Sequence, residues 1–280
     1  DFYSFCINME KASSNQNLTI THNKFHQSAN YGATIFPFRF QAYGTNLIAD
    51  NEIYDTYTNQ SVYGMYILEA QNLTITRNKI NIAPGSSTNA LYGIYLISAA
   101  TFNTINITNN QIRIEPSGGN NQLITGIHDA GAQTTINMLY NTVYIGGQST
   151  GTTNTYCVSR ENPFFNSSTW NCRNNIFYNN RTVFSGSALH YAIRNNNLDY
   201  GLFCNYNFFI GTGQFGEWMF ENLGNSVSLY NWKLASSGRD ANSIMRTAGT
   251  VNSNNLFQDV STGDLRIKTN YAEAYYVKGM

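Results

Sequence analysis

The chain is organised by a short pattern of apolar and polar positions that returns seven times. Each copy has two apolar residues spaced by two, then two further positions, an Asn, one more position and a third apolar residue. The Asn residues of the seven copies are Asn23, Asn51, Asn78, Asn110, Asn141, Asn175 and Asn207. Only the second copy is imperfect, because Asn46 stands in its first apolar place. A period of about 30 residues, with strand-type alternation inside each unit, predicts a solenoid.

Each copy predicts a strand, a corner and the start of a second strand. Apolar residues spaced by two share one face of a strand, so they point into a common core. We expect the Asn to form the corner, because its short amide tolerates left-handed backbone angles and bonds to nearby main chain. If the coils stack about 4.8 Å apart, equivalent amides can also bond one another in a ladder.

A second register lies between successive Asn corners, and it mostly reads Tyr or Thr, a small residue, then an apolar residue. Its inward row is predicted to be Ala33, Met65, Ile94, Ile127, Val158 and Ile193. Two regular strands per coil and a less regular third one predict an all-β fold, a right-handed parallel β-helix of roughly eight to nine coils. A leucine-rich horseshoe is the competing solenoid, but its Leu-dense consensus is missing.

The regular rhythm covers residues 1–212 and breaks from Gly211 onward. Residues 226–235 have helical apolar spacing, and residues 240–243 are predicted to form a turn. Apolar positions at Val251, Leu256, Leu265 and Ile267 then predict a weaker last coil. Residues 213–280 are therefore expected to be a short helical excursion and a closing coil of the same solenoid.

The closing region resembles a known family. It is similar to the closing segment of secreted right-handed β-helix proteins of Bacteroidota. The positions that carry the similarity are Trp232, residues 238–244, Leu256-Phe257 and residues 263–267. The chain departs from that pattern where the family usually has Pro before the Phe. The resemblance implies the pectin-lyase-like superfold, and type IX secretion of a longer parent protein. It implies no catalytic residues, because the shared segment is a structural closure.

Composition limits the partners. The net charge is zero and charged residues make up 11% of the chain, against about 25% in ordinary soluble domains. Such a surface gives no electrostatic basis for binding nucleic acid or anionic membranes, and no apolar run reaches the ~18 residues that would cross a bilayer. With 41 Asn and 20 Tyr, the surface suits neutral polymers such as glycans, and equally an inert extracellular rod.

The first strand, over residues 2–7, has no capping helix before it. An uncapped solenoid end exposes a strand edge. We therefore expect upstream and downstream segments of a larger parent chain to be neighbours of this one.

The four cysteines predict no metal or cofactor site, because none of them has the Cys-x-x-Cys spacing. Cys172 and Cys204 occupy the same inward slot of adjacent coils. A disulfide could just fit there, but buried free thiols are the favoured interpretation.

Two groups of charged residues are candidates for chemistry. Asp50, Glu52 and Asp55 could bind calcium, but a cross-coil charge pairing with Arg77 and Lys79 is favoured. The second group falls at the end of one strand in successive coils and consists of His128, Asp129, Arg160, Glu161 and Arg194. An acid, a base and a guanidinium could neutralise a uronic acid and abstract a proton. The alternative is a structural ion-pair cluster.

The same strand register offers a binding surface. Its outward positions are Thr34, Tyr66, Tyr95, His128, Ser159 and Arg194. The small residues beside them are Gly32, Gly64, Gly93, Gly126, Cys157 and Ala192. Together the two rows could form a shallow trough for sugars or a protein partner, with Tyr66, Tyr95, His128 and Arg194 as binding residues. Alternatively, the small residues relieve crowding at a bend.

The sequence thus favours a non-catalytic structural or adhesin-like segment of a larger secreted or cell-surface protein, with a glycan or another surface protein as candidate partner. A polysaccharide lyase or glycoside hydrolase of the pectin-lyase-like superfold is the alternative function.

Overall fold

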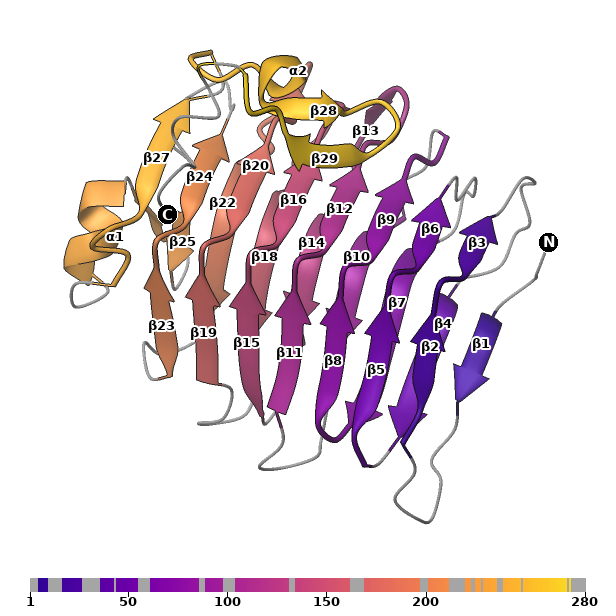
Figure 1. The fold of residues 1–280 in the computed structure, drawn as a ribbon. Coiled ribbons are helices and arrows are strands. Elements are labelled where there is room, and N and C mark those ends of the chain that lie inside the picture. The colour runs from indigo at the N-terminus through magenta and orange to yellow at the C-terminus, as the bar shows by residue number, and fades with distance from the viewer. Residues whose placement is uncertain are drawn as a thin grey trace.

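The computed structural model is a parallel β-solenoid built from three long sheets (Figure 1). It describes residues 5–9, 17–26, 36–42, 44–54, 61–85, 89–97, 104–130, 134–161, 169–196, 201–211, 220–222, 225–227, 229–235, 239–247, 249–270 and 272. The predicted fold class is confirmed. Ala33 and Thr34 of the predicted strand rows, together with Gly32 and Asp55, lie outside the described residues.

Each coil contributes one strand to each of the three sheets, and the pairing between coils is parallel. Sheet A contains β1 (Phe5–Met9), β4 (Phe36–Ala42), β7 (Val62–Ala70), β10 (Leu91–Leu96), β14 (Ile124–Asp129), β18 (Thr155–Glu161), β22 (His190–Asn196), β25 (Phe220–Asn222) and β26 (Asn225–Val227), the last of which is antiparallel to β25. Sheet B contains β2 (Thr19–Thr21), β5 (Asn46–Ala49), β8 (Leu73–Thr76), β11 (Thr104–Thr108), β15 (Thr135–Leu139), β19 (Thr169–Arg173) and β23 (Leu202–Asn205).

Sheet C follows the Asn corner of each coil. It contains β3 (Lys24–His26), β6 (Glu52–Tyr54), β9 (Lys79–Ile82), β12 (Gln111–Ile114), β16 (Thr142–Ile145), β20 (Ile176–Asn179), β24 (Phe208–Gly211) and β27 (Ile244–Thr247). Three coils add a short fourth strand, which gives a small sheet of β13 (Gly119–Asn120), β17 (Gln148–Ser149) and β21 (Thr182–Val183).

The coil count is lower than the eight to nine predicted. Within the described residues, seven coils have a strand in all three sheets, and β25 and β27 supply part of an eighth. The predicted number assumes that the whole chain consists of coils of about 30 residues. The chain beyond residue 250 instead leaves the stack and folds back over sheet C.

The core is a continuous apolar column inside the coils. The predicted inward row is buried at Met65, Ile94, Ile127, Val158 and Ile193, and these residues join those of sheets B and C in one cluster. Register pairs such as Ile94 with Ile127 show that like residues stack on like residues in adjacent coils. Burial of the same apolar row in every coil is what holds a solenoid together.

The Asn corners form the predicted ladder. Asn141 shows the repeating unit: its amide donates to Asn175 Oδ1 at 3.1 Å and to the carbonyl of Ile107 at 2.7 Å. Its own Oδ1 accepts the backbone N–H of Asn110 at 3.1 Å and the amide of Asn110 at 3.0 Å. Because the six corner residues from Asn51 to Asn207 are almost fully buried, each amide satisfies backbone groups that would otherwise have no partner.

The left-handed backbone of the corner is not on the Asn itself, which corrects the prediction. It falls on the residue just before the Asn, with φ between 53° (Arg77) and 60° (Tyr140). The residues in this conformation before the seven corner Asn residues are His22, Asp50, Arg77, Asn109, Tyr140, Asn174 and Tyr206. The Asn is needed for its side chain and not for its backbone freedom, since side chains of many kinds occupy the left-handed position.

The last Asn of the ladder is capped by the segment that follows helix α1 (Leu229–Ala235). Ser243 replaces Asn in the next coil, and its Oγ accepts the backbone N–H of Asn207 at 2.8 Å. The wholly buried Asp240 accepts the Asn207 amide at 3.2 Å and the Trp232 indole N–H at 2.8 Å. Burial raises the pKa of this carboxyl. The predicted turn is present, and the predicted helix is present from Leu229 onward; its expected start at residue 226 is wrong, since residues 225–227 belong to strand β26. Helix and turn together close the ladder.

The final segment does not form another complete coil. Helix α2 (Ser253–Leu256) leads into an antiparallel pair, β28 (Phe257–Asp259) and β29 (Asp264–Ile267), which lies across the outer face of sheet C (Figure 1). A second apolar cluster joins the two; it comprises Tyr144, Ile176, Tyr178, Phe208 and Ile210 from the sheet and Val251, Leu256, Phe257, Val260 and Leu265 from the segment. The expected last coil is thus replaced by a cover, because sheet C is apolar on its outer face here.

The cysteines are as predicted where the structure describes them. Cys157, Cys172 and Cys204 are buried free thiols, and Cys172 lies directly opposite Cys204 in adjacent strands. Their role is to fill the column as small apolar side chains.

Candidate binding surfaces

The outward positions of sheet A form one continuous row. Tyr66, Tyr95, His128, Ser159 and Arg194 are register partners on five consecutive strands. The structure therefore brings together the four residues that the sequence singled out for binding.

The rings of this row stack on one another. The centroids of Tyr66 and Tyr95 are 5.3 Å apart with planes 7° from parallel, and those of Tyr95 and His128 are 4.9 Å apart at 29°. A second row runs beside it, in which Tyr63 and Tyr92 stack at 4.9 Å. Because the ring faces cover each other, the ladder presents ring edges and phenol hydroxyls outward.

The small residues lie inside the coil and do not flank a trough. A Cβ on Gly93 would lie 2.5 Å from the carbonyl oxygen of Gly126 and 2.5 Å from Ile112 Cγ2 of sheet C. The edge-to-face contact of Tyr63 with Tyr66, three residues apart, places both rings on the outer side. The strand must therefore bend between them, and the small residues relieve crowding at that bend.

Tyr95 and His128 of the outward row are uncharged at neutral pH. Burial, helped by neighbouring phenols, raises the pKa of Tyr95 to about 12, so its hydroxyl keeps its proton at neutral pH. Burial, helped by the charge of Arg194, lowers the pKa of His128 to about 4, so the imidazole is neutral there. His128 Nδ1 and Ser159 Oγ are buried, and neither has a hydrogen-bond partner among the residues that the structure describes. Buried polar atoms without a partner are rare in folded proteins.

The five charged residues at the strand ends are divided between two environments. Arg194 forms an ion pair with Glu161, and its guanidinium lies 5.0 Å from the centroid of the Tyr156 ring. Asp129 is fully buried and accepts the Trp170 indole N–H at 2.9 Å. Arg160 is equally buried and donates to Asn195 at 3.3 Å. Asp129 and Arg160, which are register partners, are thus enclosed by protein and do not belong to the outward row that holds His128.

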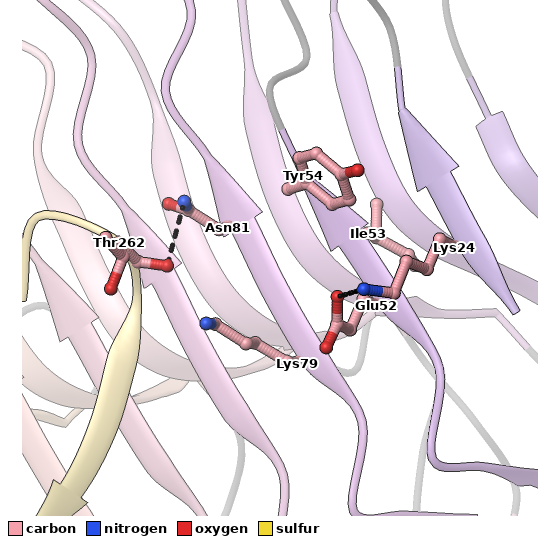
Figure 2. A pocket seen from close by; sticks show the side chains of 7 residues that line it. All are labelled: Lys24, Glu52, Ile53, Tyr54, Lys79, Asn81 and Thr262. Atoms are coloured by element: carbon pink, nitrogen blue, oxygen red, sulfur yellow. Dashed lines mark hydrogen bonds and ion pairs between the residues drawn. The ribbon is translucent and has the colours of Figure 1, made fainter. Parts of the chain in front are cut away.

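A pocket that the sequence did not predict lies between sheet C and the β28–β29 turn (Figure 2). It has a volume of about 370 Å³. Its lining comes from three adjacent strands and the turn: Lys24, Glu52, Ile53, Tyr54, Lys79, Asn81 and Thr262. The turn is held to the sheet by a 3.4 Å bond from the Asn81 amide to the Thr262 carbonyl, and by a 2.7 Å bond from the Leu265 N–H to Gln111 Oε1.

Part of this pocket could have been found in the sequence. Lys24, Glu52 and Lys79 each follow a corner Asn, and they form one outward row of charge in register. The predicted cross-coil pairing is confirmed for Arg77, which binds Asp50 through two bonds of 2.8 and 2.7 Å. Glu52, however, pairs with Lys24 at 3.2 Å and not with Lys79. No sequence signal placed Thr262 beside Asn81, because 181 positions separate them.

Comparison with known proteins adds no relative: no family model, curated protein or solved structure matches the chain. The fold defines the class, a parallel β-solenoid. Among the described residues, no three His, Cys, Asp or Glu side chains meet in a way that could hold a metal ion. The helices in the described part of the chain are too short or too polar to cross a membrane.

Proposed function

We propose that this chain is a non-catalytic structural segment, a rigid spacer or adhesin-like module, of a larger secreted or cell-surface protein. The observation that carries the proposal is the unbroken stacking: parallel pairing links each coil to the next in all three sheets, and the buried Asn ladder runs through the corners. Such a column resists bending and extends by adding coils, which suits a module that holds other parts at a fixed distance.

The location and the parent protein belong to the same proposal. Low charge and a chain rich in Asn and Tyr suit an extracellular setting with neutral partners. The similarity of the closing segment to secreted β-helix proteins of Bacteroidota supports export of a longer parent, by type IX secretion in that group. Neighbouring segments of the parent chain are the proposed partners at the two ends of the stack.

The proposed contact surface is the outward row of sheet A, with Tyr66, Tyr95, His128 and Arg194 as its binding residues. Its phenol hydroxyls and neutral imidazole can exchange hydrogen bonds with the hydroxyls of a glycan or with a protein backbone. Because the ring faces are occupied by their neighbours, binding is expected to depend on hydroxyl groups more than on ring stacking.

A glycan array tests this surface with variants that remove only the hydroxyls. We expect the double variant Tyr66→Phe/Tyr95→Phe to bind the glycans recognised by the wild type about tenfold more weakly, since each lost hydrogen bond contributes about 0.5–1.5 kcal/mol. The matched control is Tyr140→Phe, an exposed tyrosine at an Asn corner outside sheet A. Unchanged binding by the double variant, or no glycan bound by the wild type, would remove glycan recognition from the proposal.

A polysaccharide lyase remains the competing function, because His128 lies on the same face as Arg194. The chain is incubated with alginate, pectin and glycosaminoglycans while the absorbance of unsaturated products is followed. The structural proposal expects no product from any of them. Product formation that disappears in a His128→Ala variant would establish the lyase instead.

A further inference from the structure

The pocket between sheet C and the β28–β29 turn has the features of a ligand site that is separate from the row on sheet A. Its volume of about 370 Å³ falls in the range of about 300–1,000 Å³ that small-molecule sites occupy. Three strands and a turn from the far end of the chain build it (Figure 2). A long-range contact of this kind holds the lining groups in fixed positions.

One cation in the pocket is available to a ligand. The Lys79 side chain extends toward the turn (Figure 2), and within the described part of the chain its ammonium has neither a hydrogen bond nor an ion pair. The neighbouring charges have ion-pair partners of their own. Lys24 pairs with Glu52 at 3.2 Å, and Asp264 pairs with Arg266 at 2.6 Å. The pKa of Asp264 is lowered by Arg266 and also by the charge of Lys79, which therefore lies near this carboxylate without pairing with it. An ammonium beside a sheltered surface favours an anionic group.

An aromatic face and an oriented amide adjoin this ammonium. Tyr54 stacks on His26 with one face, at 4.7 Å and 15°. On its other side the register partner is Asn81, whose shorter side chain leaves that ring face open to the pocket. The Asn81 amide is fixed by Arg113, which donates to its Oδ1 at 2.8 Å, and by its own bond to Thr262. An amide nitrogen has two hydrogens, so one remains to donate to a ligand hydroxyl.

From these groups we infer that the pocket binds a sugar residue that carries a carboxylate. The apolar face of a pyranose ring would lie on Tyr54, its carboxylate would accept from the Lys79 ammonium, and a ring hydroxyl would accept from the Asn81 amide. A sugar with a carboxylate is the ligand class that would use all three groups at once: the flat apolar face, the unpaired cation and the positioned donor. The inference does not depend on the function proposed for sheet A.

Titration calorimetry with the whole chain tests the inference. The probes are methyl β-D-glucuronide, the matched neutral methyl β-D-glucoside, and benzoate as an anion that is not a sugar. We expect the glucuronide to bind at least tenfold more tightly than either comparison probe, and added NaCl to weaken it. In Lys79→Gln this preference over the glucoside is lost, a change of about tenfold, as expected for one charge-assisted hydrogen bond. In Tyr54→Leu the glucuronide binds more weakly, because the flat ring face is gone.

The control variant is Arg173→Gln, which makes the same change in net charge on an exposed position of sheet B. It should bind the glucuronide as the wild type does. Equal affinity for the glucuronide and the glucoside, benzoate binding as tight as the glucuronide, or full binding by Lys79→Gln would each overturn the inference. So would the absence of any heat from the glucuronide at tens of millimolar. Circular dichroism spectra that match the wild type keep a loss of binding from being mistaken for misfolding.

Discussion

Replacement of one corner residue, Asn141→Ala, tests whether the Asn ladder holds the solenoid together. The Asn141 side chain accepts two hydrogen bonds from Asn110, and the two hydrogens of its amide are shared among three acceptors, Asn175 Oδ1 and two carbonyls. Its loss leaves the buried backbone N–H of Asn110 without its acceptor, because the small Ala side chain has nothing to offer in its place.

The magnitude follows from the kind of group that is lost. An orphaned buried donor costs about 1–3 kcal/mol, and each further hydrogen bond whose partner keeps another contact contributes about 0.5–1.5 kcal/mol. Asn175 Oδ1 keeps the bond from the Asn141 backbone N–H at 2.9 Å, so its share is small. We expect Asn141→Ala to lower the free energy of unfolding by about 4 kcal/mol.

The same coil provides a matched control. Asn137 lies four residues earlier, on the outer side of sheet B, and bonds Asn106 at 2.8 Å and Asn171 at 2.7 Å in a partly exposed ladder. Water can replace these bonds, so Asn137→Ala should cost less than about 1 kcal/mol. Urea unfolding followed by circular dichroism measures both variants. Equal losses in the two would refute the reasoning that burial of the corner amides is what matters.

Two further predictions concern sheet A. Gly93→Ala should destabilise the chain by about 3 kcal/mol, because the new methyl group meets backbone and Ile112 at 2.5 Å. Gly249→Ala, where a Cβ meets nothing within 4 Å, is the control in the same urea assay. Equal losses of unfolding free energy in the two variants would contradict the close packing at the Gly93 bend. Neutral His128 contributes stability that is complete above its ordinary pKa of 6.5 and declines as the pH falls toward about 4. Between pH 6.5 and 4.5 the wild type should therefore lose about 2 kcal/mol more than His128→Gln, and equal losses would show that this imidazole is not buried.

The sheet A surface was predictable in its order but not in its shape. Register alone placed Tyr66, Tyr95 and His128 in one outward row, because coils of similar length align equivalent residues. Strict alternation, however, puts Tyr63 on the opposite face from Tyr66, and the structure places both rings outside. The bend at the intervening glycine depends on how closely sheet C approaches from within, which the strand's own sequence does not record.

The architecture of this protein is encoded in its repeat pattern. A corner Asn flanked by inward apolar residues specifies one coil, and repetition specifies the stack, because every coil meets only a neighbour of the same pattern. The repeat pattern does not encode where the chain stops stacking or what the last segment covers; both depend on contacts between distant parts of the chain. Phe257 packs near Tyr144 and Tyr178, with ring centroids 6.4 and 6.2 Å away, and that contact carries Thr262 to the edge of the pocket. This contact depends on two apolar surfaces, the outer face of sheet C and the last segment, that are far apart in the sequence. A pattern that repeats within each coil cannot predict that they pack together.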